Sequence, residues 1–218
     1  MTKSTLFTLA LLGAASHLSA APTLITGTPA DSLLNAPTGP SLQFGTIYNF
    51  DSLTANTSYA SYSPATGVTI SSPDTLVVLP YGTQSSPNEL FDNSATGSAN
   101  ITVKLASGTK EIGIGIADSD SVTITLQALN ANGTALGSAF NVMLPSATVN
   151  PFNGYYAISD TAYDIYGLEV SQSIGNANYS GLAIDDLQVA PTPEPGSLAL
   201  IGLSAAALLA FGRLRRRA

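Results

Sequence analysis

The chain has 218 residues, of which 14 are acidic and 7 are basic, with one histidine and no cysteine. Its formal net charge of −7 repels phosphate backbones, so we expect no nucleic-acid partner. The lack of cysteine excludes disulfide bonds and cysteine nucleophiles.

Residues 1–21 have the pattern of a secretory signal peptide. Lys3 supplies a positive start, residues 6–15 form an apolar core, and residues 16–21 form a cleavage region of mostly small side chains. We therefore expect export through the translocon and removal of this segment. The removed segment contains His17, the only histidine, so Ser-His-Asp triads and histidine zinc sites are excluded for the mature chain.

The body between the two end segments is acidic and sparsely charged. Five of the seven basic residues and one acid lie in the ends, which leaves 13 acids against Lys104 and Lys110. Cations are therefore the expected ionic partners. A glycosidase would need two carboxylic acids at a set separation, but Glu89, Glu111 and Glu169 have no spacing that singles out a pair. We expect a protein that is not an enzyme, with a glycosidase as the least favoured alternative.

Residues 22–40 are interrupted by prolines and are expected to form an extended lead-in. From residue 41 onward the apolar residues alternate with polar ones, which is the pattern of half-buried β-strands. Residues 41–190 therefore predict an all-β body, an antiparallel two-sheet β-sandwich of jelly-roll type. The expected strands contain residues 42–44, 47–50, 68–70, 76–79, 101–105, 112–116, 122–126, 142–144, 166–170 and 187–189.

Turn residues separate these strands. Asn130–Gly133 supplies side chains that tolerate positive φ, so this segment is expected to close a hairpin. Further reversals are expected at residues 64–67, 107–108 and 145–146.

The last expected strand of the body contains two adjacent aspartates. If Leu187 and Val189 face the core, strict alternation turns Asp185 toward the core as well and Asp186 away from it. A core-facing carboxylate needs hydrogen-bond donors or a cation, and Ca²⁺ favours such oxygen ligands. Asp51, Asp185 and Asp186 are therefore candidate ligands of a structural Ca²⁺ ion. The alternative is that Asp185 caps local backbone amides.

Five tyrosines are candidates for a sugar-binding surface, because aromatic faces pack on sugar rings. Rim and core packing is the alternative for the same residues, and the chain has no tryptophan to support a platform. The candidates are Tyr59, Tyr62, Tyr155, Tyr156 and Tyr163.

Residues 191–218 have three parts in a fixed order. Pro193, Glu194 and Pro195 come first, an uncharged apolar helix is expected over residues 197–212, and a basic end follows over residues 213–218. The apolar run is shorter than the roughly 20 residues that an upright span prefers, so it needs the arginines to reach the cytoplasmic side. The expected membrane contacts are Leu198, Leu200, Ile201, Leu203, Leu208, Leu209 and Phe211, and the basic residues are Arg213, Arg215, Arg216 and Arg217.

This order resembles the PEP-CTERM sorting signal of exported bacterial proteins. The resemblance implies that an exosortase, a membrane-embedded transpeptidase, recognises Pro193, Glu194 and Pro195, removes the tail and delivers the body to the cell surface or extracellular matrix. An ordinary tail anchor after a proline-rich linker is the alternative.

The body resembles galactose-binding and MAM-type jelly rolls. The resemblance rests on Phe50-Asp51 near the start and on the closing segment of residues 181–189, Gly-Leu-Ala-Ile-Asp-Asp-Leu-Gln-Val. It implies a jelly roll and, in some members, carbohydrate binding or structural calcium. The expected function is a non-catalytic surface or matrix protein, with a lectin-like module that attaches the cell or matrix to polysaccharide as the alternative.

Overall fold

The computed structural model describes residues 21–27, 45–80, 88–94, 98–117, 123–144, 154–173 and 181–191. These residues form strands and loops without a helix. The strands are β1 (Thr23–Gly27), β2 (Thr46–Tyr48), β3 (Ser58–Ala65), β4 (Val68–Leu79), β5 (Glu89–Asp92), β6 (Ser98–Thr109), β7 (Glu111–Ala117), β8 (Thr123–Leu129), β9 (Phe140–Met143), β10 (Gly154–Ser159), β11 (Ile165–Ser173) and β12 (Leu182–Val189).

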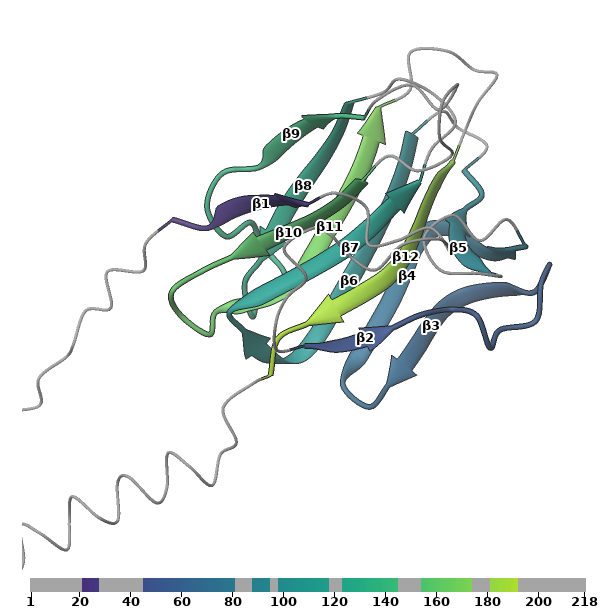
Figure 1. Ribbon diagram of the computed structural model, residues 1–218, viewed down its shortest axis with the longest axis horizontal. Coiled ribbons are helices and arrows are strands. Elements are labelled where there is room, and N and C mark those ends of the chain that lie inside the picture. The colour runs from purple at the N-terminus through teal and green to yellow at the C-terminus, as the bar shows by residue number, and fades with distance from the viewer. Residues whose placement is uncertain are drawn as a thin grey trace, which may run out of the picture.

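The strands form two layers that lie face to face (Figure 1). The front layer has the order β1-β10-β7-β12, with β2 paired to β12. The back layer has the order β4-β6-β11-β8-β9, with β3 paired to β4. Strand β5 pairs with both β12 and β4 and so joins the layers into one antiparallel sheet. The predicted all-β sandwich of jelly-roll type is confirmed.

The hydrophobic core lies between the two layers. Alternate residues of β6 and β7 point into it, including Ile101, Val103, Ile112 and Ile114, and all four are fully buried. Burying an isoleucine or valine side chain contributes about 1.5–3 kcal/mol relative to exposure. The period-two pattern of the sequence is therefore the pattern that fills this core.

Alternation located most of the strands. The structure places strands β2, β4, β6, β7, β8, β9, β11 and β12 at predicted runs. The two runs predicted at residues 68–70 and 76–79 belong to one strand, β4, and the run at residues 42–44 lies outside the described residues. Strand β1 lies inside the segment predicted as an extended lead-in, where it pairs with β10 at the edge of the front layer. Strands β3, β5 and β10 had not been predicted.

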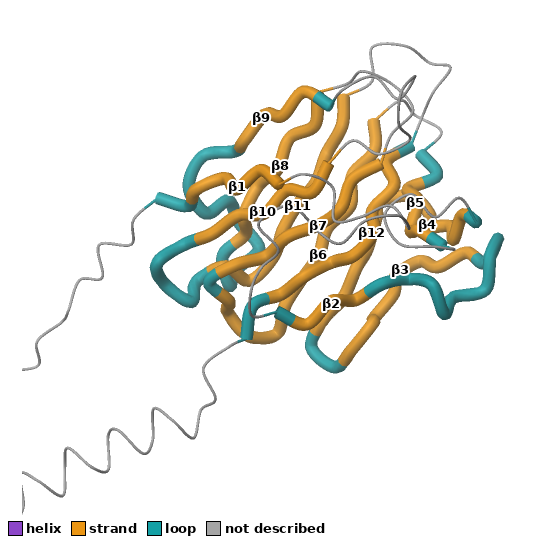
Figure 2. Tube along the Cα trace, in the orientation of Figure 1, coloured by secondary structure: helices purple, strands orange, loops and turns teal. Residues whose placement is uncertain are grey.

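The described connections range from two-residue turns to the loops between β2 and β3 and between β8 and β9 (Figure 2). The predicted hairpin after β8 is confirmed, because the Gly133 amide donates to the Asn130 carbonyl at 2.9 Å and Gly133 has a φ of 73°. A reversal at residues 66–67 joins β3 to β4, and Gly67 has a φ of 84°. Strand β6 continues to Thr109, so the next reversal comes at Lys110 rather than at residues 107–108. The reversal predicted at residues 145–146 lies outside the described residues.

Both described ends of the body lie at the same end of the front layer (Figure 1). Thr23 pairs with Ser159, Ser159 pairs with Glu111, and the Ala190 amide donates to the Glu111 carbonyl at 3.0 Å. The helices predicted in residues 1–21 and 197–212 lie outside the described residues. Within the described ranges, no helix is long and apolar enough to cross a membrane.

Candidate functional site

The closing strand β12 contains a β-bulge at its two aspartates. Its register against β7 shifts between Asp185 and Gln188, and Asp186 has a φ of 45°. Ile184, before the bulge, and Leu187, after it, both face the core. The extra residue breaks the alternation that the sequence analysis assumed, so Asp185 faces away from the core. The prediction that Asp185 shares a face with Leu187 is wrong for this reason.

The Asp185 side chain caps a backbone amide of the bulge. It is 1% exposed, and its Oδ1 accepts a hydrogen bond from the Asp186 amide at 2.8 Å. This contact holds Asp186 in the left-handed conformation that aspartate tolerates better than most residues. The capping alternative for Asp185 is therefore the one that the geometry supports.

Asp51 has a different set of partners. Its Oδ1 accepts from the Asn88 amide at 3.5 Å, and its carbonyl accepts from Asn88 Nδ2 at 3.1 Å. Among the described residues, no three acidic, histidine or cysteine side chains gather in a way that could hold a metal ion. The structure therefore does not assemble Asp51, Asp185 and Asp186 into the predicted group of ligands.

The outer face of the front layer carries Tyr155. Its side chain is 3% exposed, and its hydroxyl has no hydrogen-bond partner among the described residues. The ring lies over Gly113, where a Cβ atom would collide with the tyrosine hydroxyl. Burial raises the pKa of Tyr155 far above its ordinary range, and the charges of Asp186 and Glu111 raise it further. Tyr155 is thus a neutral, buried group rather than an exposed stacking surface.

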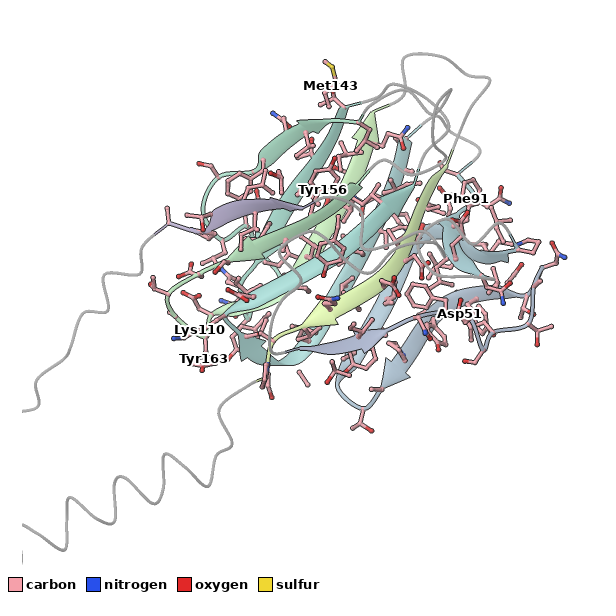
Figure 3. All side chains as sticks on the ribbon, viewed as in Figure 1. Asp51, Phe91, Lys110, Met143, Tyr156 and Tyr163 are labelled. Atoms are coloured by element: carbon pink, nitrogen blue, oxygen red, sulfur yellow. The ribbon has the colours of Figure 1, made fainter. Side chains whose placement is uncertain are left out.

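The five candidate tyrosines are not gathered on one surface. The rings of Tyr59 and Tyr62 are neighbours, with centroids 5.5 Å apart, and they pack on the core opposite Leu76 and Ile70. Tyr156 is buried in the core. Tyr163 is 41% exposed and lies below the Lys110 ammonium group at the lower end of the body (Figure 3). Core and rim packing accounts for most of these side chains.

Asp92 is a buried acid that the sequence analysis did not single out. It is fully buried, accepts from Ser72 Oγ at 2.8 Å and accepts from the Asn100 amide at 2.7 Å. Burial raises the pKa of Asp92, the two hydrogen bonds oppose this effect, and the charge of Asp74 adds to it. Since Asp92 comes two residues after the buried Leu90, alternation within β5 was the signal that could have located it.

The outer face of the back layer is polar. Asn100 Nδ2 donates to Glu169 Oε1 at 2.7 Å, and Thr102 Oγ1 donates to Asn100 Oδ1 at 3.4 Å. The strand register places Ser71, Thr102, Glu169 and Gln127 in one row across four strands. Such a row of hydroxyl, amide and carboxylate groups can form hydrogen bonds with a polar ligand.

Comparison with known proteins identifies the C-terminal tail. Residues 191–217 match the PEP-CTERM protein-sorting motif, which includes the predicted Pro193, Glu194 and Pro195. These three residues and the tail behind them lie outside the described residues. No curated protein matches the chain.

Several solved structures are similar to this chain at low identity and low TM-score. The K2 cleaved adhesin domain of Lys-gingipain is 11% identical with a TM-score of 0.42, over 68% of this chain and 98% of that domain. A family 11 carbohydrate-binding module of Clostridium thermocellum is 12% identical with a TM-score of 0.32, over 68% of this chain and 95% of that module. The bacteriophage CBA120 tailspike protein 4 is 17% identical with a TM-score of 0.37, and the match spans 57% of this chain but 19% of the tailspike chain. Because residues 191–217 match this sorting motif, the chain is an exported protein with a C-terminal PEP-CTERM sorting signal.

Proposed function

We propose that this protein is a non-catalytic component of the cell surface or extracellular matrix, exported by the translocon and released from its tail by an exosortase. The observation that carries this proposal is the place of the motif. Strand β12 ends at Val189 and the motif begins at residue 191. Cleavage near residues 193–195 therefore leaves all the described strands in the released body.

The tail serves as a transient membrane anchor in this proposal. The apolar run from Leu198 to Phe211 has 14 residues. As a helix it would be about 21 Å long, against a hydrocarbon core of about 30 Å. The following arginines make up the difference by extending toward the cytoplasmic headgroups.

The chemistry of the body supports a non-catalytic role. Glu111 Oε1 accepts from Ser159 Oγ at 3.1 Å in the front layer, whereas Glu169 accepts from Asn100 in the back layer. These two acids belong to different layers, and this separation favours the non-catalytic proposal over a glycosidase that uses them as a pair.

The test compares the length of the protein and the cell fraction that contains it between a host that has an exosortase and a strain that lacks it. We expect the wild-type body to lose its tail and to reach the surface fraction in the first host only. Replacing Pro193, Glu194 and Pro195 by alanine should leave the full-length chain in the membrane fraction. Pro191→Ala, at the edge of the motif, is the matched control. Unchanged shortening and surface delivery of the triple variant would refute the proposal.

Polysaccharide binding is the second candidate function, and the polar row on the outer face of the back layer favours it. The expected ligand is an uncharged or weakly charged polysaccharide, because hydroxyl and amide groups dominate this row. Affinity electrophoresis in polysaccharide gels is the test, with Gln127→Ala in the row and Asn132→Ala in an exposed turn as its control. Equal migration of all three proteins in every gel would refute this candidate.

A further inference from the structure

We propose that one end of the sandwich is a lipid-facing surface that rests on the membrane headgroups while the C-terminal tail is inserted. This surface, the tail end, consists of Lys110 in the β6–β7 turn and residues 160–164 in the β10–β11 loop, beside the end of β12. The inference rests on the membrane anchor of the proposed function and adds which face of the body the lipid contacts.

The tail end is fixed to the point where the chain leaves the body. The Ala190 amide donates to the Glu111 carbonyl at 3.0 Å, and Thr109 Oγ1 donates to the Ala190 carbonyl at 2.9 Å. The Asp160 amide donates to the Lys110 carbonyl at 2.8 Å, which ties the β10–β11 loop to the same turn. The body is therefore ordered up to Ala190, directly beside Lys110.

The tether between the body and the membrane is short. Seven residues lie between Ala190 and Leu198, the start of the apolar run. The eight steps from Ala190 to Leu198 span at most about 29 Å when fully extended. About 5–8 Å of this length lies within the headgroup layer. Strand β6 has 12 residues and ends at the tail end, so the opposite end of the sandwich is about 40 Å farther away. The tether is therefore too short for the opposite end to rest on the lipid surface in place of the tail end.

The N-terminal side of the body starts at the same end. Thr23 in β1 and Ala190 are separated by β10 and β7 in the front layer, a distance of three strand spacings or about 15 Å. A chain that still carries its N-terminal segment would thus be held to the membrane at two nearby points. Both attachments place the same end of the body against the lipid.

The side chains at the tail end suit a headgroup layer. Lys110 Nζ lies 4.9 Å from the centre of the Tyr163 ring, and Tyr163 is one of the few exposed large hydrophobic residues described (Figure 3). Tyrosine and lysine are the residues that place an apolar stem in the lipid interface and a polar tip in water.

The carboxylates at this end are partly or fully buried. Asp160 is 6% exposed, and its Oδ1 accepts from the Ala162 amide at 3.1 Å. Glu111 accepts from Ser159 Oγ, and Asp164 is half-buried with contacts of its own. Lys110, which is half-buried, is the positively charged residue of the tail end, and its ammonium group would meet anionic headgroups.

The experiment uses the full-length chain in vesicles of phosphatidylethanolamine and phosphatidylglycerol that contain a nitroxide-headgroup lipid. Because the chain has no cysteine, Thr161→Cys and Met143→Cys each accept one fluorescent label. Thr161 lies in the β10–β11 loop, and Met143 is 78% exposed at the other end of the sandwich (Figure 3). We expect the nitroxide to quench the label at residue 161 and to leave the label at residue 143 bright.

Flotation of the same vesicles separates the two proposals. If the protein does not float, the membrane anchor fails and this inference fails with it. If the protein floats and both labels are quenched equally, the anchor stands and the lipid-facing surface is refuted.

Two charge reversals test the contact itself. A lysine near an anionic membrane changes the contact equilibrium about fivefold. Lys110→Glu should lower the quenching at residue 161 accordingly, while Lys104→Glu, the same change on the outer face of the back layer, should not. Tyr163→Ser should act in the same direction as Lys110→Glu. Unchanged quenching in both Lys110→Glu and Tyr163→Ser would overturn the assigned contact.

Discussion

Asp92 ties three strands together, and its replacement by alanine should destabilise the body. The carboxylate lies at the end of β5 and accepts from Ser72 in β4 and from the backbone amide of Asn100 in β6. It is fully buried, so water cannot replace either bond without a local rearrangement. Asp92→Ala removes both acceptors and leaves the Asn100 amide without this partner.

The expected cost follows from those two bonds. A hydrogen bond to a charged group contributes about 1.5–3 kcal/mol, and burial of the charge offsets part of the sum, so we expect a net loss of about 2–3 kcal/mol. For a domain of this size, that loss lowers the melting temperature by about 5–10 °C. Thermal unfolding of residues 21–192, followed by circular dichroism, measures it. Asp74→Ala, an exposed aspartate close to Ser72, is the control and should change stability by less than about 0.5 kcal/mol.

The pH dependence of this difference gives a second test. Burial raises the pKa of folded Asp92 above its ordinary value of 3.8. Between 3.8 and the raised value the folded state binds more protons than the unfolded state, so the wild-type protein gains stability as the pH falls through this window. Asp92→Ala lacks that gain, and the stability gap between the two proteins should widen on acidification. A gap that narrows instead would show that the charged form is the one stabilised and would refute the reasoning.

Three further changes test other parts of the structure. Tyr155→Phe should raise the free energy of unfolding by about 1–2 kcal/mol, because it removes a buried hydroxyl that has no hydrogen-bond partner among the described residues, and Tyr156→Phe should not. Above pH 10 the unfolded state loses the Tyr155 proton while the folded state, whose Tyr155 pKa is raised, keeps it, so the wild type loses stability. Tyr155→Phe should lose less stability over this range. Parallel curves of stability against pH for the two proteins would contradict the burial of a neutral Tyr155. Leu187→Ala should lower the free energy of unfolding by about 2–5 kcal/mol, as measured by denaturant unfolding. Ile47→Ala, at a side chain that is 56% exposed, should lower it far less. Equal losses would contradict the assignment of Leu187 to the core. Calcium at 100 times its dissociation constant would stabilise a binding protein by about 2.7 kcal/mol. Since Asp185 Oδ1 already accepts from the Asp186 amide in the bulge, we expect the same melting temperature in calcium and in chelator. A rise in melting temperature with calcium that Asp185→Asn abolishes would instead support the predicted metal site.

The sequence predicted the body well where one face of a strand is apolar. Residues 101–105 and 112–116 alternate strictly, and both runs lie in long core strands. Strand β3 was missed because its sequence, Ser-Tyr-Ala-Ser-Tyr-Ser-Pro-Ala, is largely polar and its two tyrosines are three residues apart. The register of β3 against β4 shifts between Tyr59 and Ser61, and this irregularity allows both tyrosines to face the core. A period-two search does not detect such a strand.

The candidate site was predicted less well because its geometry depends on one inserted residue. Strict alternation places Asp185 on the same face of β12 as Leu187, whereas the bulge places the two side chains on opposite faces. A bulge is set by the match between β12 and its partner β7, which pairs Asp185 with Gly115 and Gln188 with Gly113. Nothing within residues 181–189 alone contains that information.

The position of β12 explains why the sorting signal follows it so closely. Strand β12 is the last described strand, yet it lies inside the sheet between β7 on one side and β2 and β5 on the other. Without it, these three strands would have open edges, which are sites of aggregation. The motif begins two residues after Val189, so the segment that completes the sheet comes immediately before the segment that directs sorting. A tail in this position can be removed without loss of any described strand, whereas a signal placed before β12 would separate the body from the strand that closes it.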